Sequence, residues 1–171
     1  MKKKLMLICG VFLLLNFSSN AISSTIDLTG TVRDFSQTHV DFETYLGVDQ
    51  DIVKTVLGVD GKPVYNNLAY NPTVTSVDSF NQWYNDVSGV NIPLSHTITL
   101  DNGGSGNVYS YNSNAFFPID DQGFGNEGNP HNYHFTFDLH TAFNYQGGET
   151  FTFTGDDEFW VFIYGQIGRA H

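Results

Sequence analysis

The sequence has almost no cysteine and few basic residues. Its single cysteine, Cys9, lies in an apolar N-terminal stretch, so no disulfide can hold the rest of the chain together. Only 7 of the 171 residues are Lys or Arg, against 18 Asp or Glu, and the formal net charge is −11. Nucleic-acid binding needs clustered cations, so this composition argues against nucleic acid as a partner.

The sequence also lacks the common motifs of catalysis. It contains no nucleophile elbow, zinc-protease motif, phosphate-binding loop or dinucleotide fingerprint. A glycosidase would need two carboxylates facing each other across a cleft, and the sequence does not show which Asp residues could do so. We therefore expect a protein that is not an enzyme.

Aromatic residues and glycine are plentiful. Aromatic residues make up 15% of the chain, and there are 17 glycines. A disordered acidic tail would be poor in aromatics, so we expect most of the chain to fold. The scarcity of charged residues, which make up 15%, is typical of an exported all-β protein.

Alternation of apolar and polar residues predicts several strands. It is clearest over Tyr133 to Leu139, where Tyr133, Phe135, Phe137 and Leu139 would face a core. Phe159 to Tyr164 is apolar on both faces, as a central strand would be. Further strands are expected over Thr25 to Phe35, Thr97 to Leu100, Val108 to Tyr111 and, after a turn at Gln146 to Gly148, Glu149 to Thr154.

One short helix is expected to start at Asp78 or Ser79 and to end at Gly89. Its apolar face would carry residues spaced at i, i+3, i+4 and i+7. These residues are Phe80, Trp83, Tyr84 and Val87. Together with the strands, this helix predicts an all-β fold, an antiparallel β-sandwich or barrel-like sandwich with one peripheral helix.

The N-terminus has the three parts of a secretory signal peptide. Three lysines precede an apolar stretch from Leu5 to Phe17, and a small-residue cleavage site ends at Ala21. A membrane anchor is the weaker alternative, because about 13 apolar residues are too few to span a bilayer. Cleavage would leave four basic residues against 18 acidic ones, a net charge of −14. We expect a secreted or cell-surface protein that does not insert into the membrane. The absence of cysteine and of glycosylation sequons after the leader favours bacterial export.

Asp156 and Asp157 form the sharpest polar feature, a carboxylate pair between two apolar segments. Neighbouring carboxylates repel each other unless a cation lies between them, and hard oxygen ligands suit Ca²⁺. Successive side chains of a regular strand point to opposite faces, so a shared ion requires irregular backbone here. The alternative is an acidic turn exposed to water.

A second candidate pair is Asp138 and His140, two residues apart on the polar face of one strand. They could share a transition metal, but solvated polar residues are the simpler interpretation. His134 lies too far along the same strand to join them. Asp120, Asp121 and His131 fall in a loop with no spacing typical of a site.

Several segments in order resemble the fibro-slime domain family. The matching segments are residues 30–35 (GTVRDF), 39–43 (HVDFE), 60–64 (DGKPV), 80–91 (FNQWYNDVSGVN), 116–120 (FFPID), 123–125 (GFG), 132–136 (NYHFT) and 151–163 (FTFTGDDEFWVFI). That family is similar to the lectin-like β-sandwich domain of anthrax protective antigen, which is jelly-roll-like. The resemblance covers essentially all of the chain after the leader.

The resemblance implies a function for the carboxylate pair. In sugar-binding members of the wider family, two consecutive Asp residues hold a Ca²⁺ that grips sugar hydroxyls, and Asp156 and Asp157 match that pair. We therefore expect an exported, calcium-dependent carbohydrate-binding module that serves adhesion to a glycan or polysaccharide. The alternatives are a structural cell-surface or matrix protein without a sugar site, and the binding module of a larger glycoside hydrolase.

The sequence departs from the family at its C-terminal end. The family pattern continues beyond the Asp pair with a further loop and strands, whereas here the chain stops after Gln166 and five more residues. Residues 167–171 match one reading frame of a sequencing adaptor. We therefore expect a leader over residues 1–21, an incomplete domain over residues 22–166, and a tail that is not biological.

Overall fold

The computed structural model describes residues 23–42, 49–67, 71–104, 106–143, 146–153 and 159–167. Three antiparallel strands form the main sheet in the order β2-β1-β3, and β4 pairs with β5 in a separate hairpin. The elements are β1 Thr25–Phe35, α1 Val77–Gln82, β2 Asn91–Asp101, β3 Phe135–Asp138, β4 Phe162–Ile163 and β5 Gln166–Ile167. The all-β class predicted from the sequence is confirmed, while the sandwich arrangement stays a prediction.

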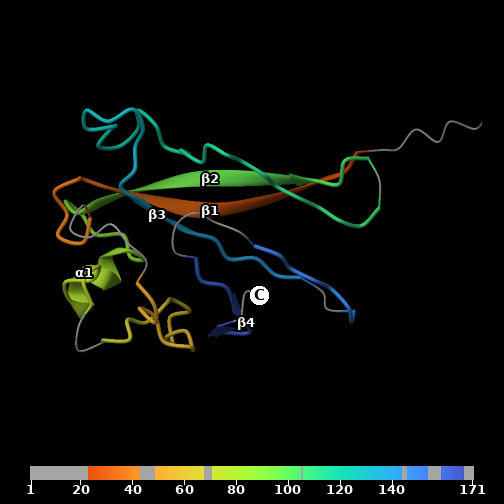
Figure 1. Cartoon of the computed structure of the whole chain (residues 1–171), viewed down its shortest axis with the longest axis horizontal. Coiled ribbons are helices and arrows are strands. Elements are labelled where there is room, and N and C mark those ends of the chain that lie inside the picture. The colour runs from red at the N-terminus through yellow and green to blue at the C-terminus, as the bar shows by residue number, and fades with distance from the viewer. Residues whose placement is uncertain are drawn as a thin grey trace, which may run out of the picture.

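Figure 1 shows the sheet as the middle layer of the described chain. Residues 106–131 run above it, and α1 lies below one end together with residues 49–67. The later residues 139–143 and 146–153 and the β4–β5 hairpin lie below the other part of the sheet. The sheet therefore separates a loop layer from the layer that contains the helix.

Strands β1 and β2 pair over their full length, from Thr25 opposite Asp101 to Phe35 opposite Asn91. Strand β1 has the bounds that its sequence pattern predicts. Strand β2 begins six residues before the predicted Thr97, because Pro93 hides the pattern. Proline is tolerated there because β2 is an edge strand.

Strand β3 packs closely against β1 at Gly30. A Cβ atom on Gly30 would lie 2.5 Å from the carbonyl oxygen of Asp138 and 2.7 Å from the Phe137 ring. Only glycine leaves room for this approach. Part of the predicted strand is wrong: Tyr133, expected to face the core, is 47% exposed, whereas His134 is 3% exposed. Pairing with β1 begins only at Phe135, and all four residues of β3 are partly buried.

Helix α1 begins at Val77 behind a capping box. The Ser76 side chain accepts from the Ser79 N–H, and the Ser79 side chain accepts from the Ser76 N–H. The predicted aromatic face is confirmed for its first three residues, which join a buried cluster. The cluster contains Ile52, Val53, Tyr65, Val74, Phe80, Trp83 and Tyr84.

The helix ends at Gln82, well before the predicted end at Gly89. Asn91 explains the early end, because its side-chain amide donates to the carbonyl oxygens of Gln82 and Asn85, both at 2.8 Å. Its side-chain oxygen accepts from the Val87 N–H at 3.0 Å. A side chain from the start of β2 thus satisfies the backbone that a longer helix would have bonded internally.

The prediction of a central strand over Phe159 to Tyr164 is wrong. Only Phe162 and Ile163 are in a strand, and their partners are Ile167 and Gln166. The turn between them has positive φ at both Tyr164 and Gly165, the geometry of a tight hairpin. The hairpin contacts residues 49–67 through a hydrogen bond from the Leu57 N–H to the Gly165 carbonyl oxygen. The hairpin also bridges from Gln166 to Val56, and Phe162 packs against the core cluster, whereas Ile163 and Tyr164 are 38% and 88% exposed.

The other predicted strands are shorter or not formed in the described residues. Between residues 108 and 111, only Ser110 makes a bridge, to Asp101. Residues 149–153 adopt no strand, although positive φ at Gly147 and Gly148 agrees with the predicted turn.

Candidate functional site

The predicted calcium ligands Asp156 and Asp157 lie outside the described residues, since the structure leaves out residues 154–158. The leader, residues 1–21, lies outside them as well. In the described part of the chain, no three His, Asp or Glu side chains form a group that could hold a metal ion. The calcium site therefore stays a prediction.

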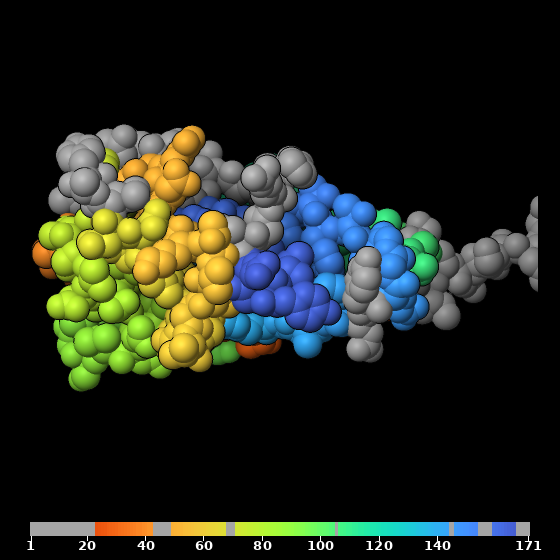
Figure 2. All heavy atoms as spheres, turned by 90° about the horizontal axis from the view of Figure 1, so that it is seen from below, coloured from red at the N-terminus to blue at the C-terminus, as the bar shows by residue number. Residues whose placement is uncertain are grey.

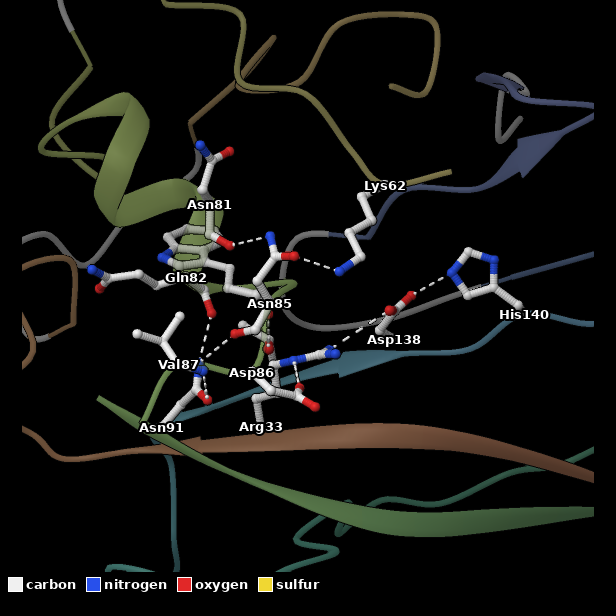
Figure 3. A network of polar contacts seen from close by, with 12 residues as sticks. Arg33, Lys62, Asn81, Gln82, Asn85, Asp86, Val87, Asn91, Asp138 and His140 are labelled. Atoms are coloured by element: carbon white, nitrogen blue, oxygen red, sulfur yellow. Dashed lines mark hydrogen bonds and ion pairs between the residues drawn. The ribbon is translucent and has the colours of Figure 1, made fainter. Parts of the chain in front are cut away.

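Asp138 and His140 do lie together, with 3.0 Å between Asp138 Oδ1 and His140 Nε2. The second oxygen of Asp138 is 3.6 Å from Nη1 of Arg33, a buried side chain. Figure 3 shows Asp138 between Arg33 and His140. Both carboxylate oxygens thus face donors of the chain itself, so a metal ion at Asp138 would have to compete with a guanidinium.

Arg33 also connects the sheet to the segment that follows α1. Its Nε donates to Asp86 Oδ1 at 2.9 Å, and Lys62 Nζ donates to the neighbouring Asn85 side chain. Removing one partner of a buried charge leaves that charge uncompensated, which is costly. The network in Figure 3 therefore holds the end of α1 on β1 and β3.

A second polar cluster anchors the long loop of residues 116–134 to the end of β1. Asp34 is fully buried, and its two oxygens accept from Asn132 Nδ2 at 2.8 Å and from the Phe124 N–H at 2.6 Å. Burial raises the pKa of Asp34, and these two hydrogen bonds oppose that shift. Gly123 packs against the same carboxylate, and an added Cβ would overlap Asp34 Oδ2.

Other side chains of the loop repeat this pattern. The Glu127 carboxylate accepts from the Ser36 hydroxyl at 2.9 Å and from the Gln37 N–H, and it lies 3.6 Å from Nδ1 of His134. Asp120 lies 2.7 Å from Nδ1 of His131 and accepts from the Asn132 N–H at 2.8 Å. The hydrogen bond with His131, followed by that from Asn132, lowers the pKa of Asp120.

Sequence reasoning missed these contacts of Asp34, Asp120 and Glu127. Asp34 and Asn132 are 98 residues apart, and no local spacing could have paired them. The donors that bind these carboxylates belong to the chain itself. The cluster therefore acts to hold the loop in place.

A different surface feature lies on the C-terminal part of the chain. Phe143, Phe151, Phe153 and Phe159 are 41–53% exposed, and each ring contacts the next. The ring centroids are 4.9 Å apart for Phe143 and Phe151, 6.5 Å for Phe151 and Phe153, and 5.2 Å for Phe153 and Phe159. We call these four residues the aromatic row. Figure 2 shows residues 159–167, in dark blue, at the surface beside residues 49–67, with the lighter blue residues 146–153 further from residues 49–67.

Comparison with known proteins finds relatives in the eukaryote Dictyostelium discoideum. The chain is similar to protein psiR (36% identity over 179 residues, 94% of this chain and 18% of psiR) and to protein psiD (40% over 156 residues, 81% and 31%). Protein psiC is 34% identical over 176 residues, 92% of this chain and 34% of psiC. The chain thus spans between about a fifth and a third of these relatives' lengths. No family model and no solved structure matches it.

These relatives correct the predicted function. They are psi proteins, and none is named as a carbohydrate-binding module, so the prediction of calcium-dependent carbohydrate binding and adhesion is wrong, together with its two alternatives. The prediction of bacterial export is corrected by the same relatives, which come from a eukaryote. Their names give no support to the fibro-slime resemblance, which stays a prediction. The part of the chain that the structure describes contains no helix able to cross a membrane.

Proposed function

We propose that this protein is an exported, non-enzymatic module that binds a partner protein through the aromatic row. The observation that supports this function is the exposure of four phenylalanines in mutual contact, Phe143, Phe151, Phe153 and Phe159. Soluble proteins rarely leave a contiguous apolar patch uncovered unless it binds something.

Aromatic side chains suit protein interfaces in particular. Each buries a large apolar area and has few rotatable bonds, so docking costs little side-chain entropy. The rings of the aromatic row already contact one another, which orders them before a partner arrives. Pre-ordered contact residues leave more of the interaction energy available for binding.

The backbone beside the row favours an extended partner. Residues 149–153 take part in no strand and in no backbone–backbone hydrogen bond with another described residue. An extended segment could add to such backbone while its apolar side chains cover the rings. Because the chain has a net charge of −11, we expect Lys or Arg to flank the apolar residues of that segment.

The leader supports an extracellular setting. Residues 1–21 carry the basic, apolar and small-residue parts of a signal peptide. An exported chain without cysteine after its leader could not be stabilised by disulfides. N-terminal sequencing of the protein secreted by a eukaryotic host tests this, and we expect a mature chain that begins near Ile22.

Peptide display on the purified protein tests the binding proposal. A library of short random peptides is selected on the wild type and counter-selected on a Phe151→Ser, Phe153→Ser double variant. We expect enriched peptides that combine apolar residues at alternate positions with Lys or Arg. Their affinity should fall at least about tenfold in the double variant, as for loss of interface anchor residues.

The matched control is a Thr97→Ala, Thr99→Ala double variant, which changes exposed side chains of β2 away from the row. It should keep the wild-type affinity for the selected peptides. Selection of peptides that bind all three proteins equally would overturn the proposal, as would a selection with no enrichment. A wild-type dimer in sedimentation that the serine variant abolishes would also overturn it, because the occupant would then be a second copy of this chain.

A further inference from the structure

A cavity of about 410 Å³ lies beside α1, on the part of the molecule that holds the anchored loop. The turn after β1 contributes His39 and Val40 to its lining, and the helix contributes Asp78 and Gln82. Phe124 of the long loop and Val90, just before β2, also line it. A volume of this size is at the small end of the range for sites that bind small molecules.

The charge in this cavity is negative and uncompensated. Asp78 is exposed, its carboxylate has no hydrogen-bond partner among the described residues, and no Lys or Arg lines the cavity. Another cavity, of about 310 Å³, is lined by both Asp51 and Lys54. Of these two cavities, the one beside α1 has a carboxylate and no Lys or Arg in its described lining.

The hydrogen bonds of His39 leave the amide group of Gln82, which lines the cavity, with unused donors. The Asp41 N–H donates to His39 Nδ1 at 3.3 Å, so the proton of the neutral ring lies on Nε2. His39 Nε2 then donates to Gln82 Oε1 at 2.8 Å. The Gln82 Nε2 group keeps two N–H donors without a partner among the described residues, and Figure 3 shows this side chain pointing away from the Arg33 network.

One wall of the cavity is apolar. The Phe124 ring lines it and is partly exposed, and Val40 and Val90 add aliphatic surface. The Phe124 backbone is fixed by its hydrogen bond to the buried Asp34, which holds the residue in place. An aromatic face attracts cations as well as apolar groups.

We propose that this cavity binds a small organic ammonium ion that carries an apolar body and a hydrogen-bond acceptor. The Asp78 carboxylate pairs with the ammonium group, the Gln82 amide donates to the acceptor, and the apolar body packs on Phe124. This site is independent of the aromatic row, which lies on the C-terminal part of the chain.

Titration calorimetry on the purified protein tests the site with three probes of the same shape. The amine 2-amino-1-phenylethanol carries a cation, the alcohol 1-phenylethane-1,2-diol is neutral, and the acid mandelate carries an anion, and each keeps a hydroxyl acceptor beside the phenyl ring. We expect the amine to bind more tightly than the alcohol and the acid not to bind. Replacing Asp78 by Asn should weaken amine binding about fivefold, the effect of losing a partly solvated ion pair.

Two further variants separate the cavity from the overall charge. Asp51→Asn removes one exposed carboxylate outside the cavity and should leave amine binding unchanged. Phe124→Ala keeps the backbone N–H that binds Asp34 and should weaken binding of the amine and the alcohol alike. Equal binding of amine and acid by the wild type would overturn the proposal, as would equal losses in Asp78→Asn and Asp51→Asn. Binding of none of the probes would overturn it too.

Discussion

The loop of residues 116–134 and the C-terminal residues 141–143, 146–153 and 159–167 have much in common. Both are rich in aromatic residues and contain little regular structure. They differ in what their polar side chains do. The loop is fixed to β1 and the turn after it by Asp34 and Glu127, whereas the Glu149 carboxylate accepts from the backbone of its own turn, at Gln146 and Gly147.

The aromatic residues follow the same division. Phe116 packs against Phe135 and Phe137 of the sheet, and Phe117 stacks on His131 with ring centroids 3.8 Å apart. The phenylalanines of the aromatic row contact one another and remain exposed. The loop of residues 116–134 thus packs on the sheet, because the buried Asp34 carboxylate binds its backbone. The aromatic row has no such carboxylate among the described residues, and its rings stay exposed for binding.

The strongest test of this division compares two phenylalanines. Phe80→Ala should lower the free energy of unfolding by about 3–5 kcal/mol, because the ring is fully buried in the core. Phe151→Ala should lower it by less than about 1 kcal/mol, because half of the side chain is already exposed. Urea unfolding measures both variants. Similar losses would mean that the row is part of the core.

A pair of glycines tests the anchor of the loop. Gly123→Ala should cost about 2–4 kcal/mol, because its φ is positive and the added Cβ overlaps the Asp34 carboxylate. Gly125→Ala, also at positive φ but in open space, should cost only about 1–2 kcal/mol. Thermal unfolding of the two variants checks the difference. Equal costs would show that the contact with Asp34 is loose.

Asp34 gives the anchor a dependence on pH. Its folded-state pKa is raised above 3.8, so the folded protein binds the proton more tightly than the unfolded chain. The stability contributed by that protonation is complete below the unfolded pKa and is lost as pH rises through the folded pKa. Asp34→Asn should remove this dependence and cost about 1–3 kcal/mol, because Asn132 and Phe124 donate to different oxygens of Asp34 and one of these becomes an NH₂ group that cannot accept. Urea unfolding across the acid range tests both expectations, and an unchanged pH profile would contradict them.

The smallest expected effect concerns the predicted calcium pair. If Asp156 and Asp157 hold Ca²⁺, a tenfold excess of calcium over its Kd should stabilise the wild type by about 1.4 kcal/mol. Asp157→Asn should abolish that gain without changing the melting temperature measured with a chelator. Scanning calorimetry with calcium and with magnesium checks this. A gain that persists in the variant would place the ion elsewhere.

Local sequence patterns predicted those elements that can be recognised without knowing which distant segments they pack against. The strand β1 and the aromatic cluster that begins in α1 were predicted from residues close in sequence, and both were found, although the burial of β1 does not alternate. The side chain of His134 was placed on the wrong face because it packs against Phe42, which is far away along the chain, and lies near Glu127 across the turn that precedes it. Phe159 to Tyr164 was misread because an apolar run does not show whether neighbouring strands will cover it.

The candidate sites were harder to predict. The Asp138–His140 pair was visible as a spacing, but the contact of Asp138 with Arg33 depends on how β3 pairs with β1. The cavity beside α1 combines residues from four separate segments, and no motif links them. The aromatic row was readable only as a set of strand-forming phenylalanines.

The central position of β1 has a consequence for the way this protein folds. The first strand of the described chain lies between β2, which begins 56 residues after it ends, and β3, which begins 100 residues after it ends. A chain that leaves the ribosome from its N-terminus therefore presents β1 long before either neighbour exists. Pairing between segments so far apart in sequence slows folding. During synthesis β1 therefore stays unpaired, and we expect chaperones to bind its exposed apolar residues before those of the later strands.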